Sequence, residues 1–202
     1  MAAVSDEILR KSSQGRHRLG DRAEEPSPEG WRGLFTALAA GDRKALESIY
    51  RVAARKIFGL ALWRTGSVED AGDVVQEVFL RLAQKHHRLG RVRDPRGWLL
   101  GLAHHVAVDV ARRRTRRSTE PLDDVPFLKA PEVDGARAID AERASALLAK
   151  LPPAQRDVIY LRHFADCTFA LIGDITGVPT FTAASRYRLG IERLRRLMEK
   201  TQ

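Results

Sequence analysis

The spacing of apolar residues constrains the fold of this chain more than any other feature of its sequence. Apolar side chains recur every three or four positions along most of the 202 residues, which is the period of an amphipathic helix. No window alternates apolar with polar residues in the way that a half-buried strand requires. Aromatic residues, which strands favour, make up only 6% of the chain. The sequence therefore predicts an all-α protein.

Capping residues mark three helix boundaries. Gly41 followed by Asp42 interrupts the first apolar pattern, as the end of one helix and the N-cap of the next would do. Ser67 precedes a second pattern in the same way. Asp94 precedes Pro95, and proline suits the first position of a helix. This third helix continues into a run of arginines.

The composition changes after the arginines. Residues 118–140 contain three prolines and six acidic residues and lose the helical spacing. Such a segment is typical of a flexible, acidic linker between domains. We therefore predict two small helical domains at 31–117 and 137–202, joined by a linker at 118–136. Residues 1–30 have mixed charge and few apolar side chains, and we expect a disordered N-terminal extension there.

The segment from Phe169 to Pro179 carries the sharpest local motif. It predicts a short helix, a turn at Gly177 and a second helix, which is the outline of a helix-turn-helix. The second helix of that motif enters the major groove with its N-terminal end foremost. The side chains expected to face DNA are Thr180, Thr182, Ser185, Arg186 and Arg188. Those expected to hold the core are Leu189, Leu194 and Leu197. A glycine turn alone is weak evidence, so an ordinary helical hairpin with a solvated basic face is the alternative.

Five arginines in six residues end the third predicted helix. They are Arg112, Arg113, Arg114, Arg116 and Arg117. Each arginine can neutralise a phosphate and release counterions. Two of them would suffice to complement the helix dipole, whereas five, on a chain of net charge +9, indicate a polyanionic partner.

An acidic face is predicted on the second helix. Asp70, Asp73 and Glu77 recur at three- and four-residue spacing, opposite Val74 and Val75. Such a face on a basic chain suits a basic protein surface better than DNA. Taken alone, an acidic face is more often simply solvated.

Enzyme, metal and membrane functions find little support. One cysteine, Cys167, excludes a disulfide framework and a multi-cysteine zinc site, and suits a reducing cytoplasm. The histidines form adjacent pairs, His86–His87 and His104–His105, rather than the i, i+4 pairs that chelate zinc on one helix. Neither a membrane-length apolar segment nor a secretory signal is found. We predict a cytoplasmic protein without catalytic activity, metal or cofactor.

Four motifs, in order, resemble the extracytoplasmic-function (ECF) group of bacterial sigma-70 family RNA polymerase sigma factors. Residues 40–50 resemble the first conserved helix pair, and residues 70–80 resemble the polymerase-clamp-binding motif. Residues 94–99, leading into the arginines, are similar to the promoter-melting and minus-ten segment. Residues 151–158 resemble the start of the domain that binds the minus-thirty-five element. The resemblance covers about residues 31–199.

The resemblance implies a function and its partners. It implies a sigma factor that binds core RNA polymerase, directs it to specific promoters and helps to melt the minus-ten region to initiate transcription. Promoter DNA is the second partner implied, and an anti-sigma factor is a third. The 31–117 domain would be sigma region 2 and the 137–202 domain sigma region 4.

The resemblance also assigns roles to residues. Polymerase binding would involve Asp70, Asp73, Gln76 and Glu77. Minus-ten DNA binding would involve Arg91, Arg93, Trp98, His105, Arg112, Arg113, Arg114, Arg116 and Arg117. An unpaired base would enter a loop pocket at about residues 89–94. Minus-thirty-five binding would involve Thr180, Thr182, Ser185, Arg186 and Arg188.

The chain departs from the family pattern at several of these places. It has Leu171-Ile-Gly173 where Glu-Ile-Ala is common, and Ala184 lacks a charge that could reach phosphate. His105 stands where an asparagine is usual, and Gly101 where an arginine is frequent. Two alternatives therefore stay open. One is a degenerate sigma-like protein that binds polymerase without initiating transcription, and the other is a stand-alone helix-turn-helix regulator.

Overall fold

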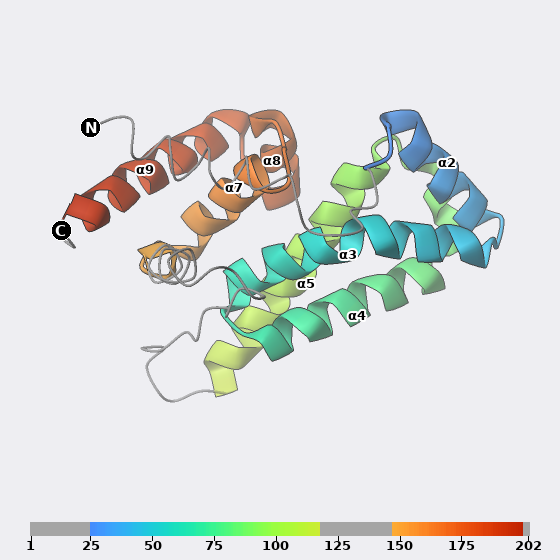
Figure 1. Ribbon diagram of the computed structural model, residues 1–202, viewed down its shortest axis with the longest axis horizontal. Helices are drawn as coiled ribbons and strands as arrows, with labels where there is room; N and C mark the ends of the chain where they lie inside the picture. Colours follow the sequence, from blue (N-terminus) through green and yellow to red (C-terminus); the bar gives the residue numbers. More distant parts are fainter. Residues whose placement is uncertain (1–24, 118–146, 200–202) are drawn as a thin grey trace, which may run out of the picture.

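The described chain is helical. The structure is a computed structural model that describes residues 25–117 and 147–199. Within these ranges it contains α-helices and one 3-10 helix and no strand, so the predicted all-α class is confirmed (Figure 1). Residues 1–24 of the predicted N-terminal extension and the whole predicted linker at 118–136 lie outside the described residues.

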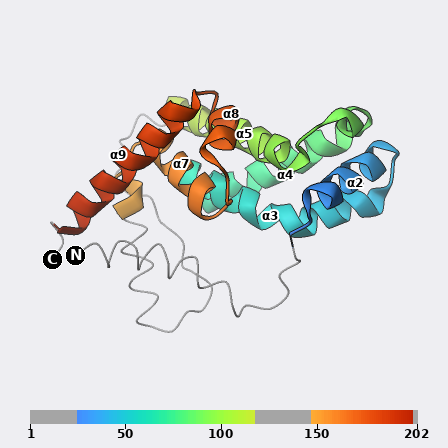
Figure 2. The ribbon, with the colours of Figure 1, turned by 90° about the horizontal axis from the view of Figure 1, so that it is seen from above.

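The helices form two groups. The first comprises α2 (Pro28–Ala39), α3 (Arg43–Thr65), α4 (Val68–Gln84), the 3-10 helix η1 (His86–Arg91) and α5 (Pro95–Arg117). The second comprises α7 (Pro153–His163), α8 (Phe169–Thr176) and α9 (Thr180–Glu199). Helices α3, α4 and α5 pack together, with α2 and η1 at one end of them and the second group toward the other (Figure 1). Seen from above, α7 lies against α3 and α8 against α5 (Figure 2).

The three predicted helix starts are confirmed by their caps. The Asp42 carboxylate accepts a hydrogen bond from the backbone N–H of Lys44 at 2.9 Å. The Ser67 hydroxyl accepts one from the N–H of Asp70 at 3.2 Å. The Asp94 carboxylate accepts one from the first turn of α5 at 3.0 Å. Each cap satisfies a backbone donor that the helix itself leaves without a partner.

The first described helix begins earlier than the sequence indicates. Helix α2 starts at Pro28, inside the stretch 1–30 that was predicted to be disordered. The Ser27 hydroxyl caps its first turn at 3.1 Å, and proline occupies its first helical position. Trp31 and Phe35 are 4% and 1% exposed, so α2 is anchored by two large aromatic side chains rather than by many small ones.

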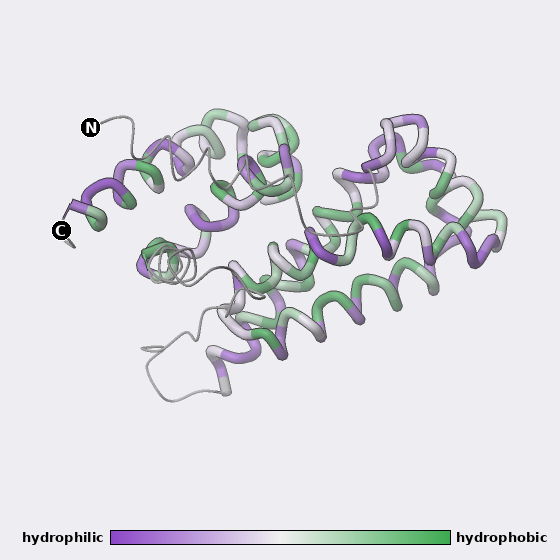
Figure 3. The backbone as a smooth tube through the Cα atoms, viewed as in Figure 1, coloured by the Kyte–Doolittle hydropathy of each residue, from purple (hydrophilic) through white to green (hydrophobic). Residues whose placement is uncertain are grey.

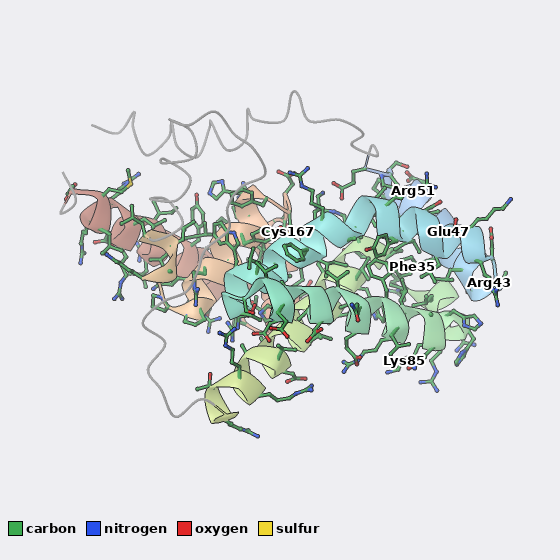
Figure 4. All side chains as sticks on the ribbon, turned by 60° about the horizontal axis from the view of Figure 1, so that its bottom comes forward. Phe35, Arg43, Glu47, Arg51, Lys85 and Cys167 are labelled. Atoms are coloured by element: carbon green, nitrogen blue, oxygen red, sulfur yellow. The ribbon has the colours of Figure 1, made fainter. Side chains whose placement is uncertain are left out.

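The core lies where the helices face one another. The large, fully buried side chains of the first group are Phe35, Ile49, Ile57, Leu60, Leu62, Val74, Leu82, Leu89 and Leu99. Those of the second group are Ile159, Leu161 and Ile172. Each turn of α4 has both hydrophobic and hydrophilic residues (Figure 3). Phe35 points between the helices, whereas Arg43, Glu47 and Arg51 extend outward from α3 (Figure 4). The buried side chains thus recur along each helix at the spacing that the apolar residues show in the sequence.

Leu89, the first residue of the segment 89–94 in which we expect a base-binding loop, is buried rather than exposed. Residues up to Arg91 belong to η1, and the Leu89 side chain is only 1% exposed. Because η1 packs against α2, this apolar side chain anchors the turn between α4 and α5. Leu89 is therefore a core residue and not part of a pocket wall.

The helix-turn-helix geometry of α8 and α9 depends on two glycines. Gly177 ends α8 with a φ of 69°, in the left-handed region that glycine tolerates best. A Cβ at Gly173 would lie 2.7 Å from the carbonyl oxygen of Val178. The turn therefore passes closer to α8 than an alanine at position 173 would allow.

Leu189 is not a core residue of α9, contrary to the sequence analysis. Its side chain is 46% exposed, whereas Leu194 packs against the core. The neighbouring Gly190 faces α7 instead, and a Cβ there would lie 2.9 Å from Ile159 Cδ1. Because α7 approaches the backbone of α9 at this glycine, the preceding leucine is turned outward.

A partly buried polar contact also joins α7 to α9. The His163 Nε2 and the Tyr187 hydroxyl share a hydrogen bond of 2.9 Å. Burial lowers the pKa of His163, the charge of Arg162 lowers it further, and Asp166 partly opposes them. The folded state therefore favours the neutral imidazole.

We expect Leu60→Ala to lower the free energy of unfolding by about 2–5 kcal/mol, because it leaves a cavity in the core. Leu80→Ala makes the same chemical change at a side chain that is 53% exposed, and should alter stability by less than about 0.5 kcal/mol. Urea denaturation followed by tryptophan fluorescence measures this difference, since all three tryptophans lie in α2, α3 and α5. Equal losses in both variants would contradict the assigned core.

The pKa of His163 also predicts a pH dependence. A histidine whose folded-state pKa is lowered stabilises the fold above its unfolded pKa, and this contribution is lost as the pH falls below about 6.5. His163→Gln keeps a hydrogen-bonding group but cannot titrate. Its Tm should therefore fall less between about pH 7.5 and about pH 5.5 than that of the unaltered chain. Far-UV circular dichroism measures this, with the exposed His87→Gln as a control that keeps the full fall.

Candidate protein and nucleic-acid interfaces

The four residues of the predicted acidic face lie on α4 but differ in exposure. Asp73 and Gln76 are exposed, whereas Asp70 and Glu77 are partly buried. Glu77 accepts a hydrogen bond from Arg81 Nε at 2.6 Å, one turn further along α4. The Asp73 carboxylate makes no ion pair with any residue in the described ranges. Asp73 is thus the most available negative charge on this face.

An ion pair connects this face to α5. Arg114 Nη1 donates to Asp70 Oδ2 at 2.8 Å, and both side chains are partly exposed. Sequence reasoning had placed Asp70 in one site and Arg114 in the other. The structure brings the two together, so the acidic face and the arginine run adjoin each other.

Two exposed apolar side chains next to the acidic face were missed from the sequence. Tyr50 on α3 is 51% exposed, and its ring lies 4.8 Å from that of Phe79 on α4. Leu80 is 53% exposed. The signal for Leu80 was present, because it follows Glu77 at three-residue spacing on the same helix face. Apolar groups rimmed by charges are typical of a protein interface.

The predicted cationic residues fall into two groups rather than one. Arg91 and Arg93 are exposed just before α5, whereas Arg112, Arg113 and Arg116 are exposed near its end. At 1.5 Å per residue, about 25 Å of helix separates the two groups. The side chain of Arg117 is not among the side chains that the structure describes. A ligand touching both groups must be extended, as a nucleic-acid strand is.

Trp98 and His105 lie on a different side of α5, facing α8. The Trp98 ring meets Phe35 edge-on at 6.0 Å and 84°, so part of it anchors the core. A groove of about 410 Å³ separates this side of α5 from α8. The residues that line it are Asp94, Gly97, Trp98, Gly101, Leu102, His105, Leu171, Asp174 and Ile175.

The predicted DNA-facing residues of α9 cluster at its N-terminal half. Thr180 and Arg188 are exposed, and Thr182, Ser185 and Arg186 are partly so. Phe181 is 75% exposed at the entry of the helix. This end of α9 presents hydroxyl, guanidinium and aromatic groups to solvent, which suits contacts to phosphates and base edges.

The buried position of Cys167 makes its thiol unreactive. Its side chain is fully buried, and burial raises the pKa of the thiol to about 11, although Arg96 and Lys56 partly oppose this. A protonated, buried thiol is a poor nucleophile. Across the described residues, no group of three or more potential metal ligands comes together, and no helix there has an apolar length that could cross a bilayer.

Two family models match the chain. Sigma-70 region 2 matches residues 49–117, which include α4 and α5, and sigma-70 region 4 matches residues 147–196, which include the helix-turn-helix. Together they span more than half of the chain.

Individual relatives agree with these models. The chain is 31% identical to the ECF RNA polymerase sigma factor RpoE of Cereibacter sphaeroides, over 78% of this chain and 88% of that relative. It is 29% identical to SigM of Mycobacterium tuberculosis over 89% of this chain and 88% of that relative. The fold is similar to that of CnrH in complex with the cytosolic domain of CnrY, with a TM-score of 0.63, 19% identity and coverage of 85% of this chain and 98% of CnrH. It is equally similar to RpoE of Bartonella quintana in complex with the anti-sigma factor NepR, with a TM-score of 0.63, 19% identity and coverage of 77% and 98%.

These matches confirm the resemblance drawn from the four sequence motifs. Region 2 precedes region 4 along the chain. Their helices carry the acidic face, the arginine run and the helix-turn-helix that the sequence predicts. The chain belongs to the sigma-70 family, in its ECF group, and is a sigma factor that directs RNA polymerase to promoters to initiate transcription.

Proposed function

We propose that the acidic face of α4 is the surface by which this sigma factor binds core RNA polymerase. The residues assigned to it are Asp70, Asp73, Gln76 and Glu77. One observation carries the assignment, namely that the Asp73 carboxylate makes no ion pair with a described residue and shares its face of α4 with Leu80, which lies two turns further along the helix and is 53% exposed. Charges give a docking surface its specificity and on-rate, and apolar groups at its centre give affinity. A basic, partly apolar surface on the polymerase is the complementary partner.

We assign the two DNA contacts to separate helices. Minus-ten DNA is bound by Arg91, Arg93, Trp98, His105, Arg112, Arg113, Arg114, Arg116 and Arg117. The exposed cations at both ends of α5 support this, because they can follow a strand along the helix. Minus-thirty-five DNA is bound by Thr180, Thr182, Ser185, Arg186 and Arg188 at the start of α9. Two weak contacts on one polymerase gain affinity through effective concentration.

The proposal extends to domain limits and surroundings. Region 2 would comprise residues 31–117, and region 4 would comprise 137–202 after the linker at 118–136. The protein would act in the cytoplasm, where its polymerase is, and would have no catalytic activity of its own. An anti-sigma factor is a further partner, since RpoE of Bartonella quintana, which has a similar fold, is bound to one.

Reversing the charge of Asp73 tests the polymerase surface. We expect Asp73→Lys to reduce initiation by about tenfold or more, because it opposes a basic partner with a like charge. The measurement is run-off transcription on sheared host genomic DNA, with core polymerase from the same source, with and without the sigma factor. Glu29→Lys makes the same change on α2 and should leave initiation unaltered. Binding to polymerase without new transcripts from the unaltered chain would contradict a role in initiation.

The arginine run predicts a salt dependence. With a promoter identified by the run-off experiment, holoenzyme binding to an oligonucleotide of its minus-ten strand can be followed across salt concentrations. Arg113→Ala should reduce the slope of log affinity against log salt by about 0.7, the value for one lost single-strand phosphate contact. Arg51→Ala, on the outer face of α3, should leave the slope unchanged (Figure 4). Equal slopes in both variants would contradict the proposed contact between Arg113 and a DNA phosphate.

A further inference from the structure

Phe181 at the start of α9 has the most exposed large apolar side chain in the described part of the protein. Its ring is 75% exposed, whereas Tyr187, Ile191 and Leu194 of the same helix pack against the core. Isolated apolar side chains are common on protein surfaces, so exposure by itself identifies no partner. The partner follows from the residues that surround this ring on α9.

The ring lies on the face of α9 that bears the predicted DNA contacts. Phe181 is the second residue of the helix, and Ser185 and Arg188 follow it at four- and seven-residue spacing, so the three share one face. Ala183 and Gly190, which are buried, lie on the opposite face. In a helix-turn-helix the N-terminal residues of the second helix contact the base edges. Phe181 is therefore placed to meet a base.

Ala184 extends the apolar surface of Phe181. It is partly exposed and follows Phe181 at three-residue spacing, so the two side chains are neighbours on the helix surface. Neither side chain has a polar atom, so neither can hydrogen-bond to a base edge or a phosphate. The C5-methyl group of thymine is the apolar group that bases present in the major groove, and phenylalanine and alanine are both residues that contact it.

The charge around the ring favours DNA over a protein partner. Between residues 180 and 191, α9 contains Arg186 and Arg188 and no acidic residue. The N-terminus of a helix adds a partial positive charge at the same end. A protein that covered Phe181 would have to present an acidic surface to these groups, whereas duplex DNA presents phosphates on both sides of the groove.

We propose that Phe181, with Ala184 beside it, contacts a thymine C5-methyl group in the major groove and makes thymine a preferred base in the minus-thirty-five element. This inference rests on the minus-thirty-five role proposed for α9 and names one chemical group that the helix recognises. The contact removes apolar surface of the ring and of the methyl group from water. Phosphate contacts of the arginines position α9, and the ring selects the base.

Replacing thymine by deoxyuridine tests the contact, because this change removes the methyl group and keeps the base pair. The promoter is one identified by run-off transcription, with the change made on both strands of its minus-thirty-five element only. We expect unaltered holoenzyme to bind the thymine promoter at least about threefold more tightly than the deoxyuridine promoter, as the loss of one buried methyl group implies. Holoenzyme with Phe181→Ala should bind the two promoters equally.

Two further variants serve as controls. Leu189→Ala also shortens an exposed apolar side chain of α9, but it lies eight residues, or about 12 Å, further along the helix. It should leave the thymine preference unchanged. Phe181→Leu keeps an apolar side chain and should retain part of the preference. Since positions 181 and 189 are both exposed, all three variants should keep the Tm of the unaltered chain.

The outcomes separate this inference from the minus-thirty-five role on which it rests. An equal affinity of unaltered holoenzyme for both promoters, or an undiminished thymine preference in Phe181→Ala, would overturn the methyl contact. Weaker binding of Phe181→Ala to core polymerase without DNA would also overturn it and would assign the ring to a protein surface. Arg188→Ala should weaken binding to both promoters alike. If it weakens neither, the minus-thirty-five role of α9 itself is wrong.

Discussion

The burial of α3 is the constraint on which the rest of the structure depends. This helix packs against α2, α4 and α5 of its own group and against α7 of the other. Ile49, Ile57 and Leu60 are completely buried along it, and removing such side chains from water is the main favourable contribution to folding. Because α4 and α5 both rest on α3, their relative position is fixed, and so is the position of the acidic face relative to the arginine run.

The pairing of Asp70 with Arg114 gives that arrangement a functional meaning. A partly exposed ion pair contributes little to stability, so it can be exchanged for contacts to a partner at small cost. A basic polymerase surface that takes Asp70 would release Arg114 toward a phosphate. The two surfaces that we propose for polymerase and for minus-ten DNA can therefore be coupled through two side chains, without any movement of the helices that carry them.

Features fixed by local chemistry could be predicted from the sequence. The caps at Asp42, Ser67 and Asp94 act within one helical turn, and the acidic face follows from the helical period. The contacts of Asp157 with Arg64 and His104 could not be predicted, because these partners lie 93 and 53 residues away in the sequence. The exposure of Leu189 likewise depends on how closely α7 approaches the next residue of α9.

The space above Gly59 has a consequence for handling the two regions apart. In the intact chain Tyr160 fills it and Phe164 covers Trp63, which is left only 8% exposed. A fragment that ends after α5 would present this indole and the bare glycine backbone to water as one apolar depression. Such depressions attract the aromatic side chains of other molecules. In isolated region 2, the surface that α7 covers would thus become an apolar patch prone to self-association, and a polar residue at position 63 would reduce that tendency.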